Sequence, residues 1–178
     1  SDPTLDSSYE GQVWFNSTSG TLKTVVASAT WSSSTPMTTA RAYLGGTGTQ
    51  TAGLACGGFL PPHTNVTEEY NGTGWANSGN LNVTRGFNAA CGPQTAALTF
   101  GGETPSVPAE DATEEYNGSS WTNGGNLNEG NYGIMGAGTQ TAAVAAGGNS
   151  DSPPTSKATV AEYDGSSWTN VTSMPTAF

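Results

Sequence analysis

Charged residues are scarce in this 178-residue sequence, and most of those present are acidic. Only 10% of the residues are charged, and 14 Asp and Glu outnumber 4 Lys and Arg, which gives a net charge of −10. A surface of this sign repels phosphate, so we expect no nucleic-acid partner. No apolar run approaches the roughly 18 to 20 residues that a membrane helix needs, and no basic and apolar leader opens the chain. We therefore expect no membrane insertion.

Histidine and cysteine, the usual protein ligands of transition metals, are almost absent. The one histidine is His63, in a proline-rich loop, and no second His or Cys stands at metal-ligand spacing from it. There is no Gly-x-Ser-x-Gly motif for a serine nucleophile, and Gly45-Gly46-Thr47-Gly48 lacks the lysine of a phosphate-binding loop. We expect no metal, no cofactor and no enzymatic activity.

Two pairs of adjacent glutamates, Glu68-Glu69 and Glu114-Glu115, raise the hypothesis of glycoside hydrolysis by two carboxylates. Adjacent residues of a strand face opposite sides of its sheet, however. The pairs also recur at the same place in successive units of the sequence. We therefore interpret them as a repeated structural position.

Aromatic residues, glycines and a polar triplet recur at intervals of 44 to 47 residues. The markers are Trp31, Trp75, Trp121 and Trp168; Tyr70, Tyr116 and Tyr163; the doublets Gly57-Gly58, Gly101-Gly102 and Gly147-Gly148; and the triplets Gln50-Thr51-Ala52, Gln94-Thr95-Ala96 and Gln140-Thr141-Ala142. Independent markers in one frame indicate a repeat protein with units of about 46 residues, at roughly 37–80, 81–126 and 127–175.

Each unit is predicted to form four short strands. In the second unit these are Gly86–Cys91, Thr95–Phe100, Ala112–Tyr116 and Trp121–Asn123, separated by glycine, proline and asparagine turns. The fold class is therefore all-β, with three complete four-stranded units.

An Asn-Gly or Asp-Gly pair precedes each of the last three tryptophans and supplies the positive φ of a tight turn. The pairs are Asn71-Gly72, Asn117-Gly118 and Asp164-Gly165. A four-residue hairpin loop makes the tyrosine and tryptophan of each unit cross-strand partners on one face.

Cys56 and Cys91 stand at non-equivalent places in the repeat. They form a disulfide only if adjacent units bring them together, and the sequence leaves both states open.

The order of these markers resembles the kelch repeat of β-propellers: a Gly-Gly doublet closes the second strand, and a Tyr, a Trp and a polar linker follow. The linkers are Ala40-Arg41, Thr84-Arg85 and Ser173-Met174-Pro175. The resemblance covers about residues 29–178 and implies kelch-like propeller blades. Closed propellers have about four to eight blades, and the sequence holds three complete units. We therefore expect the open edges to be sealed by more chain or by other copies.

Two stretches resemble proteins of tailed phages. Ala112–Gly118 through Trp121, together with Gly138–Ala142, looks like repeat arrays encoded by such phages, marine phages especially. Residues 1–28 resemble a tail-fibre hairpin module, because Glu10–Lys23 reads as a strand, a polar turn and a second strand. A plain capping hairpin over the edge of the first unit is the alternative.

These resemblances imply a virion structural and adhesion protein, a tail fibre or appendage on the particle surface. Its expected partners are other copies or virion proteins, with a host-surface glycan or protein as receptor. The alternative is an extracellular kelch-type module of a cellular protein that binds carbohydrate or protein.

The loops between the second and third strands differ in length and chemistry between units, whereas the other turns barely change. They span Phe59–Val66, Glu103–Asp111 and Asn149–Thr159. Function on repeat scaffolds usually lies in such loops, although neutral spacers are the alternative. The candidate receptor-binding residues are Phe59, Leu60, His63, Glu103, Glu110, Asp111, Asn149 and Asp151.

Overall fold

A computed structural model describes residues 13–24, 33–150 and 155–177 of the chain. The chain divides into two compact units, Ser1–Ser33 and Ser34–Phe178. Throughout the described residues the regular elements are β-strands, without a helix, and all pairings between them are antiparallel. The all-β prediction is confirmed. The domain boundary predicted between residues 28 and 29 lies outside the described residues.

The first unit contains a two-stranded hairpin of β1 (Val13–Asn16) and β2 (Thr21–Thr24). The Asn16 side-chain oxygen accepts hydrogen bonds from the backbone N–H groups of Thr18 and Ser19, each at 2.9 Å. Gly20 closes the turn at a φ of 70°. The strand, polar turn and strand expected here are confirmed.

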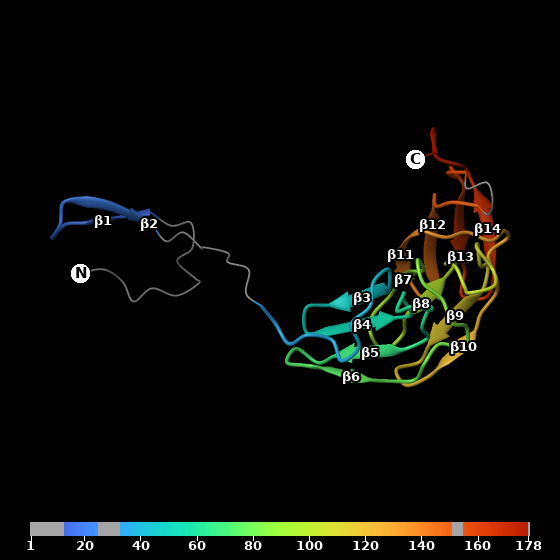
Figure 1. Cartoon of the computed structure of the whole chain (residues 1–178). Coiled ribbons are helices and arrows are strands. Elements are labelled where there is room, and N and C mark those ends of the chain that lie inside the picture. The colour runs from blue at the N-terminus through green and yellow to red at the C-terminus, as the bar shows by residue number, and fades with distance from the viewer. Residues whose placement is uncertain (1–12, 25–32, 151–154, 178) are drawn as a thin grey trace. The chain divides into compact units, whose positions relative to one another are not determined.

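The second unit contains three four-stranded sheets, which we call blades 1, 2 and 3 (Figure 1). Blade 1 comprises β3 (Gly45–Thr49), β4 (Ala52–Cys56), β5 (Thr67–Tyr70) and β6 (Trp75–Asn77). Blade 2 comprises β7 (Ala89–Cys91), β8 (Leu98–Phe100), β9 (Thr113–Tyr116) and β10 (Trp121–Asn123). Blade 3 comprises β11 (Met135–Thr139), β12 (Ala142–Ala146), β13 (Val160–Tyr163) and β14 (Trp168–Val171).

The first two strands of blade 2 are shorter than predicted. Gly86 leaves the strand and pairs with Glu103 as an isolated bridge. At the other end, Pro93 has no N–H to donate, and its carbonyl instead accepts from Ala96 N–H at 3.1 Å. The wider turn delays the start of β8 until Leu98.

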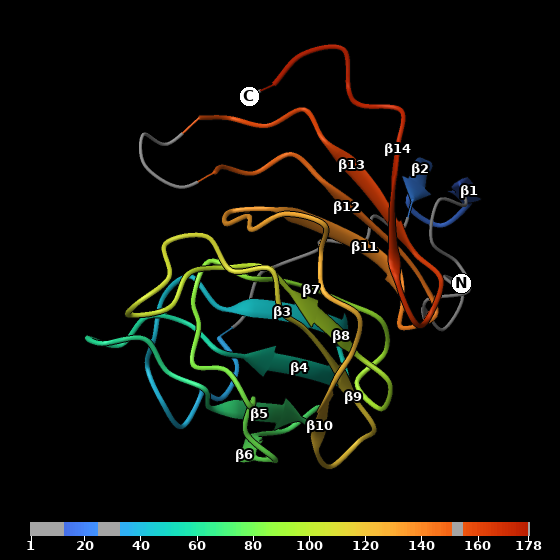
Figure 2. The same cartoon turned by 90° about the vertical axis from the view of Figure 1, so that its right-hand side faces the viewer.

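The blades follow one another with their first strands together, so that β7 lies between β3 and β11 (Figures 1 and 2). Two apolar clusters fill the spaces between neighbouring blades. The cluster between blades 1 and 2 contains Leu54, Cys56, Leu81, Ala97, Tyr116 and Trp121. The cluster between blades 2 and 3 contains Ala89, Cys91, Leu98, Phe100, Leu127, Ala143, Ala145, Ala161, Tyr163 and Trp168. The core therefore lies between sheets.

The predicted tyrosine–tryptophan pairs are confirmed in all three blades. Tyr116 lies opposite Trp121, and their ring centroids are 4.8 Å apart. The tryptophan also reaches the preceding blade, because Trp121 Nε1–H donates to Thr67 Oγ1 at 3.0 Å. Trp168 makes the same bond to Thr113 at 2.9 Å. Trp121 and Trp168 thus fix their own hairpins and the position of the sheet before each of them.

The turn before each of these tryptophans is closed by a side-chain oxygen. Asp164 Oδ1 accepts from the backbone N–H groups of Ser166 and Ser167, both at 2.8 Å. Asn71 and Asn117 do the same in blades 1 and 2. The backbone bond from Ser167, followed by those from Ser166, lowers the pKa of Asp164 to about 2.

The thiols of Cys56 and Cys91 are both free and buried. Burial raises the pKa of each to about 11. They serve as small apolar side chains of the two clusters.

We expect Trp121→Ala to lower the free energy of unfolding by about 3–5 kcal/mol, as large core truncations do. Trp121→Phe keeps a ring against Tyr116 and loses only the bond to Thr67, so we expect a loss of about 1–3 kcal/mol. Urea denaturation followed by circular dichroism measures both. Equal stability of wild type and Trp121→Ala would contradict the repeat frame.

Asp164 provides a test of pH dependence. Its pKa is lowered on folding from 3.8 to about 2, so its stabilising effect is present above about pH 4 and disappears as the pH falls towards 2. Asp164→Asn keeps the turn, as Asn71 and Asn117 do, and removes the titration. The melting temperature of the variant should therefore fall less than that of the wild type between pH 4 and pH 2. Parallel pH profiles would disprove this assignment.

Candidate functional site

The candidate binding loops begin at the glycine doublets, and the doublets of blades 1 and 2 are tied to the next blade. Gly57 and Gly58 have φ angles of 66° and 117°, which side-chain-bearing residues rarely adopt. A Cβ atom on Gly57 would lie 2.6 Å from the Arg85 carbonyl oxygen. Gly58 N–H donates to that same carbonyl at 2.8 Å, and Gly102 N–H donates to Asn131 O in the same way. The doublets therefore set where each loop starts.

A buried ion pair supports the loop base of blade 2. Arg85 and Glu114 are both fully buried, with Nη2 2.8 Å from Oε1. Arg85 Nη1 also donates to the carbonyls of Gly101 and Ala112, so one side chain joins the glycine doublet to β9. Glu114 in turn accepts from Asn82 N–H at 2.7 Å.

Blade 1 repeats this arrangement with Arg41 and Glu68. Arg41 Nε–H donates to Gly57 O at 2.7 Å. Burial by itself would raise the pKa of Glu68, but bonds from the Thr38 hydroxyl and from Arg41 outweigh it and lower that pKa. The neighbouring glutamates, Glu69 and Glu115, instead accept from tyrosines of the following blade. The two members of each pair thus face different surroundings, and neither pair is set up as two carboxylates around a substrate.

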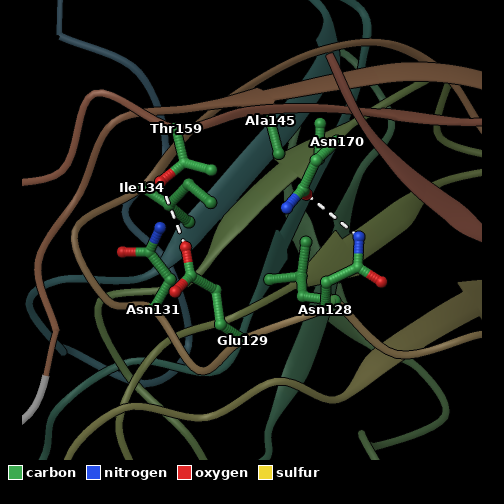
Figure 3. Close-up of a pocket in the computed structure, with 9 residues that line it drawn as sticks. Asn128, Glu129, Asn131, Ile134, Ala145, Thr159 and Asn170 are labelled. Carbon is green, nitrogen blue, oxygen red and sulfur yellow. Dashed lines mark hydrogen bonds between the residues drawn. The ribbon is translucent and has the colours of Figure 1, made fainter. Parts of the chain in front are cut away.

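Blade 3 lacks this ion pair, because Asn131 and Ala161 occupy the corresponding positions. Asn131 Nδ2 still donates to the doublet carbonyl of Gly147 at 2.6 Å, while its buried Oδ1 has no partner among the described residues. A cavity of about 20 Å³, room for about one water molecule, is lined by both residues. Figure 3 shows Asn131 beside it. The shorter side chains thus leave space that arginine and glutamate fill in blades 1 and 2.

The loop of blade 1 carries the apolar and aromatic tip. Phe59 and Leu60 are 36% and 45% exposed, and a cis peptide joins Pro61 to Pro62. The rings of Phe59 and His63 meet edge to face, with centroids 5.2 Å apart.

His63 connects this tip to the loop of blade 2. His63 Nε2 lies 2.9 Å from Glu103 Oε1. Phe59, Glu103 and Asn149 hold corresponding places just after their glycine doublets, and each forms an isolated bridge to its own linker. The structure therefore brings together Phe59, His63 and Glu103.

Glu110 and Asp111 are half-buried, and both accept hydrogen bonds at the base of their loop. Glu110 Oε1 accepts from the N–H groups of Asp111 and Ala112, both at 3.2 Å. Asp111 Oδ1 accepts from Asn126 at 3.1 Å. Burial, and then the Glu110 charge, raise the pKa of Asp111. Asp151 lies outside the described residues.

The turns that vary least between units, called the invariant turns below, lie at the opposite end of the blades. Because all four strands of a blade are antiparallel, the β3–β4 and β5–β6 turns share one end, and the β4–β5 loop leaves from the other. Gly72 packs against Thr51, Gly118 against Thr95 and Gly165 against Thr141, which confirms that the two kinds of turn are adjacent. Variable and invariant connections thus occupy different ends.

Residues 13–24, 33–150 and 155–177 hold no cluster of three or more His, Cys, Asp and Glu able to bind a metal ion. The same residues form no helix long and apolar enough to cross a membrane. No protein-family model matches the chain, and no curated protein matches it.

We expect Glu114→Ala to cost about 3–5 kcal/mol of stability, because it leaves the buried Arg85 charge without its carboxylate. Glu129→Ala is the matched control. Glu129 pairs with Lys157 at 3.2 Å but is 51% exposed, so its loss should cost about 0–1 kcal/mol.

The double variant Arg85→Asn/Glu114→Ala gives blade 2 the two residues of blade 3. It removes the unpaired charge, so it should be more stable than Glu114→Ala alone in chemical denaturation. A double variant no more stable than the single one would show that the ion pair does not account for the loss.

Proposed function

We propose that this chain is a virion structural and adhesion protein, a tail fibre or appendage of a tailed phage, and that its kelch-like blades attach to the host surface through the loop face. We define the loop face as the Phe59–Val66, Glu103–Asp111 and Asn149–Thr159 loops. We assign binding, and not catalysis, to the loop face.

The observation that carries the proposal is the exposed tip of blade 1. Phe59 and Leu60 present apolar surface beside His63 and Glu103, which provide polar atoms. An aromatic ring flanked by hydrogen-bonding groups suits a sugar, because the ring stacks on C–H groups while polar atoms bind hydroxyls. A bacterial surface polysaccharide is the receptor class that fits this chemistry.

The loop bases favour binding because they are already ordered. Glycine doublets, backbone bonds between blades and buried arginines hold the loops of blades 1 and 2 where they leave their sheets. A loop fixed in this way loses less conformational entropy when it binds. The prolines of the loops act in the same direction.

The second candidate is an extracellular kelch-type module of a cellular protein that binds carbohydrate or protein. It uses the same loop face, so the identity of the ligand separates the two functions. The resemblance of the repeat pattern to phage-encoded arrays, and that of the N-terminal hairpin to a tail-fibre module, favour the virion protein.

The test is binding of the fluorescently labelled 178-residue chain to arrayed bacterial lipopolysaccharides and capsular polysaccharides, with animal glycans on the same array. Phe59→Ala/Leu60→Ala/His63→Ala removes the tip without changing a glycine doublet or a buried arginine. We expect its affinity for the bacterial polysaccharide that the wild type binds to fall about tenfold or more, the equivalent of about 1.4 kcal/mol.

Thr169→Ala is the control, because Thr169 is exposed on β14 and belongs to none of the three loops. It should bind like the wild type. A folded triple variant that binds as well as the wild type would disprove the role of the tip. Binding to animal glycans alone would favour the cellular module.

A further inference from the structure

Consecutive blades are joined by a glutamine that repeats. Gln94 of blade 2 donates from Nε2 to two carbonyls of blade 1, Gly53 O at 2.8 Å and Tyr70 O at 2.9 Å. Gln140 of blade 3 does the same to the corresponding carbonyls of blade 2, at 3.0 and 2.8 Å. Each interface therefore has a side with the glutamine and a side with the two carbonyls.

A tyrosine and a glutamate form the second repeated contact. Tyr116 OH of blade 2 donates to Glu69 of blade 1, and Tyr163 OH of blade 3 donates to Glu115 of blade 2 at 2.7 Å. The backbone supplies a third. Phe87 N–H donates to Tyr43 O at 2.8 Å, and Gly133 N–H donates to Phe87 O at 2.9 Å.

Blade 1 carries the donor groups of all three contacts, and among the described residues none of them bonds a glutamate or a carbonyl of a preceding blade. Gln50, which corresponds to Gln94, is exposed and has no hydrogen-bond partner among the described residues. Among the described residues, Tyr70 OH bonds Ser34 alone, whereas Tyr116 OH bonds both Ser78 and a glutamate of the preceding blade. The N–H of Tyr43, likewise, donates to no described residue.

Blade 3 carries the acceptor half. A hollow of about 460 Å³ is lined by Ala143 and Tyr163, whose carbonyls correspond to those that bind Gln94 and Gln140. Glu162, which corresponds to Glu69 and Glu115, lines the same hollow and is exposed. Gly133 O is the backbone acceptor that corresponds to Tyr43 O.

The two open faces are also complementary in size. At the interface of blades 1 and 2, Gly45 of β3 lies against Ala90 of β7. At the interface of blades 2 and 3, Ala89 of β7 lies in the same way against Gly136 of β11. Met135 of blade 3 holds the position that Gly45 holds in blade 1 and Ala89 in blade 2, and it is 70% exposed. Its partner position on blade 1 is Gly46, which has no side chain and therefore leaves room for the longer methionine.

We infer that blade 3 of one copy of this chain binds blade 1 of a second copy, with Gln50 in the hollow between Ala143 and Tyr163 and with Tyr70 donating to Glu162. One repeated contact is not reproduced. Trp121 and Trp168 each donate to a threonine of the preceding blade, Thr67 or Thr113. Val160 holds the corresponding position of blade 3 and has no hydroxyl for Trp75 of the second copy. The remaining contacts pair each open donor with an open acceptor.

The number of copies follows from the number of blades. The described residues of this 178-residue chain form three blades, fewer than the about four to eight of closed propellers. Two chains supply six blades and three chains supply nine, so only two copies fall within that range. The same contact then occurs twice and closes the ring.

Light scattering coupled to size exclusion tests this on the 178-residue chain. We expect twice the 18.0 kDa chain mass. Gln50→Glu places a carboxylate against two carbonyls and near Glu162, and Met135→Asp places one on the apolar part of the opposite face. Each breaks both contacts of the ring, so we expect the dissociation constant to rise about a hundredfold. Thr122→Glu adds the same charge on β10 of the middle blade and should leave the dimer unchanged.

Mixing the two variants separates a broken contact from a failure to fold. The Met135→Asp chain has an intact Gln50, and the Gln50→Glu chain has an intact hollow, so one contact forms between them. The mixture should dimerise more strongly than either variant alone. A monomeric wild type, a stable assembly of three or more copies, a Thr122→Glu chain that dissociates like the other variants, or a mixture without recovery would each overturn the inference.

Discussion

The contact between consecutive sheets is the interaction on which the rest of this structure depends. Each blade is four short strands, with alanine and glycine concentrated in β3, β4, β7, β11 and β12, and such a sheet buries little apolar surface by itself. Both apolar clusters therefore draw on two blades. Small side chains allow close approach but fix no register. Hydrogen bonds from Gln94, Tyr116 and Trp121 to the preceding blade determine this register, because each donor has its acceptor at one position only.

The buried ion pairs act at a different level, within a blade. Arg85 joins its linker to the glycine doublet and to β9, so it ties three segments distant in sequence to one point. Blade 3 keeps only the doublet bond, through Asn131, and still forms its four strands. The pair is thus not required for a blade to form. Buried ion pairs often contribute position more than net stability, and here that position is where a loop begins.

The sequence predicted the features whose causes are local. Strand alternation, Asn-Gly and Asp-Gly turns and the five-residue step from Tyr116 to Trp121 identify the hairpins, because short-range geometry decides them. It did not predict the ion pairs, since Arg41 and Glu68 are 27 residues apart. A signal was nevertheless present. Arginine precedes the glycine doublet by 16 residues in two units, glutamate precedes the tryptophan by seven in the same two, and the third unit lacks both. The extent of β7 and β8 was missed because Gly86 and Pro93 act through partners outside their own strand.

The loop face and the open sheet faces are different surfaces, and this separation has a physical consequence. The loops leave one end of the blades, whereas Gln50 and the hollow beside Ala143 lie on the first and last sheets. A second copy bound through those sheets therefore leaves Phe59 and His63 free. It also repeats their loops around one ring, and weak binding to a repetitive surface polymer gains strength when several sites engage together. The same kind of interface that joins consecutive blades would then also join two chains. In that way it would set the number of binding sites in the ring.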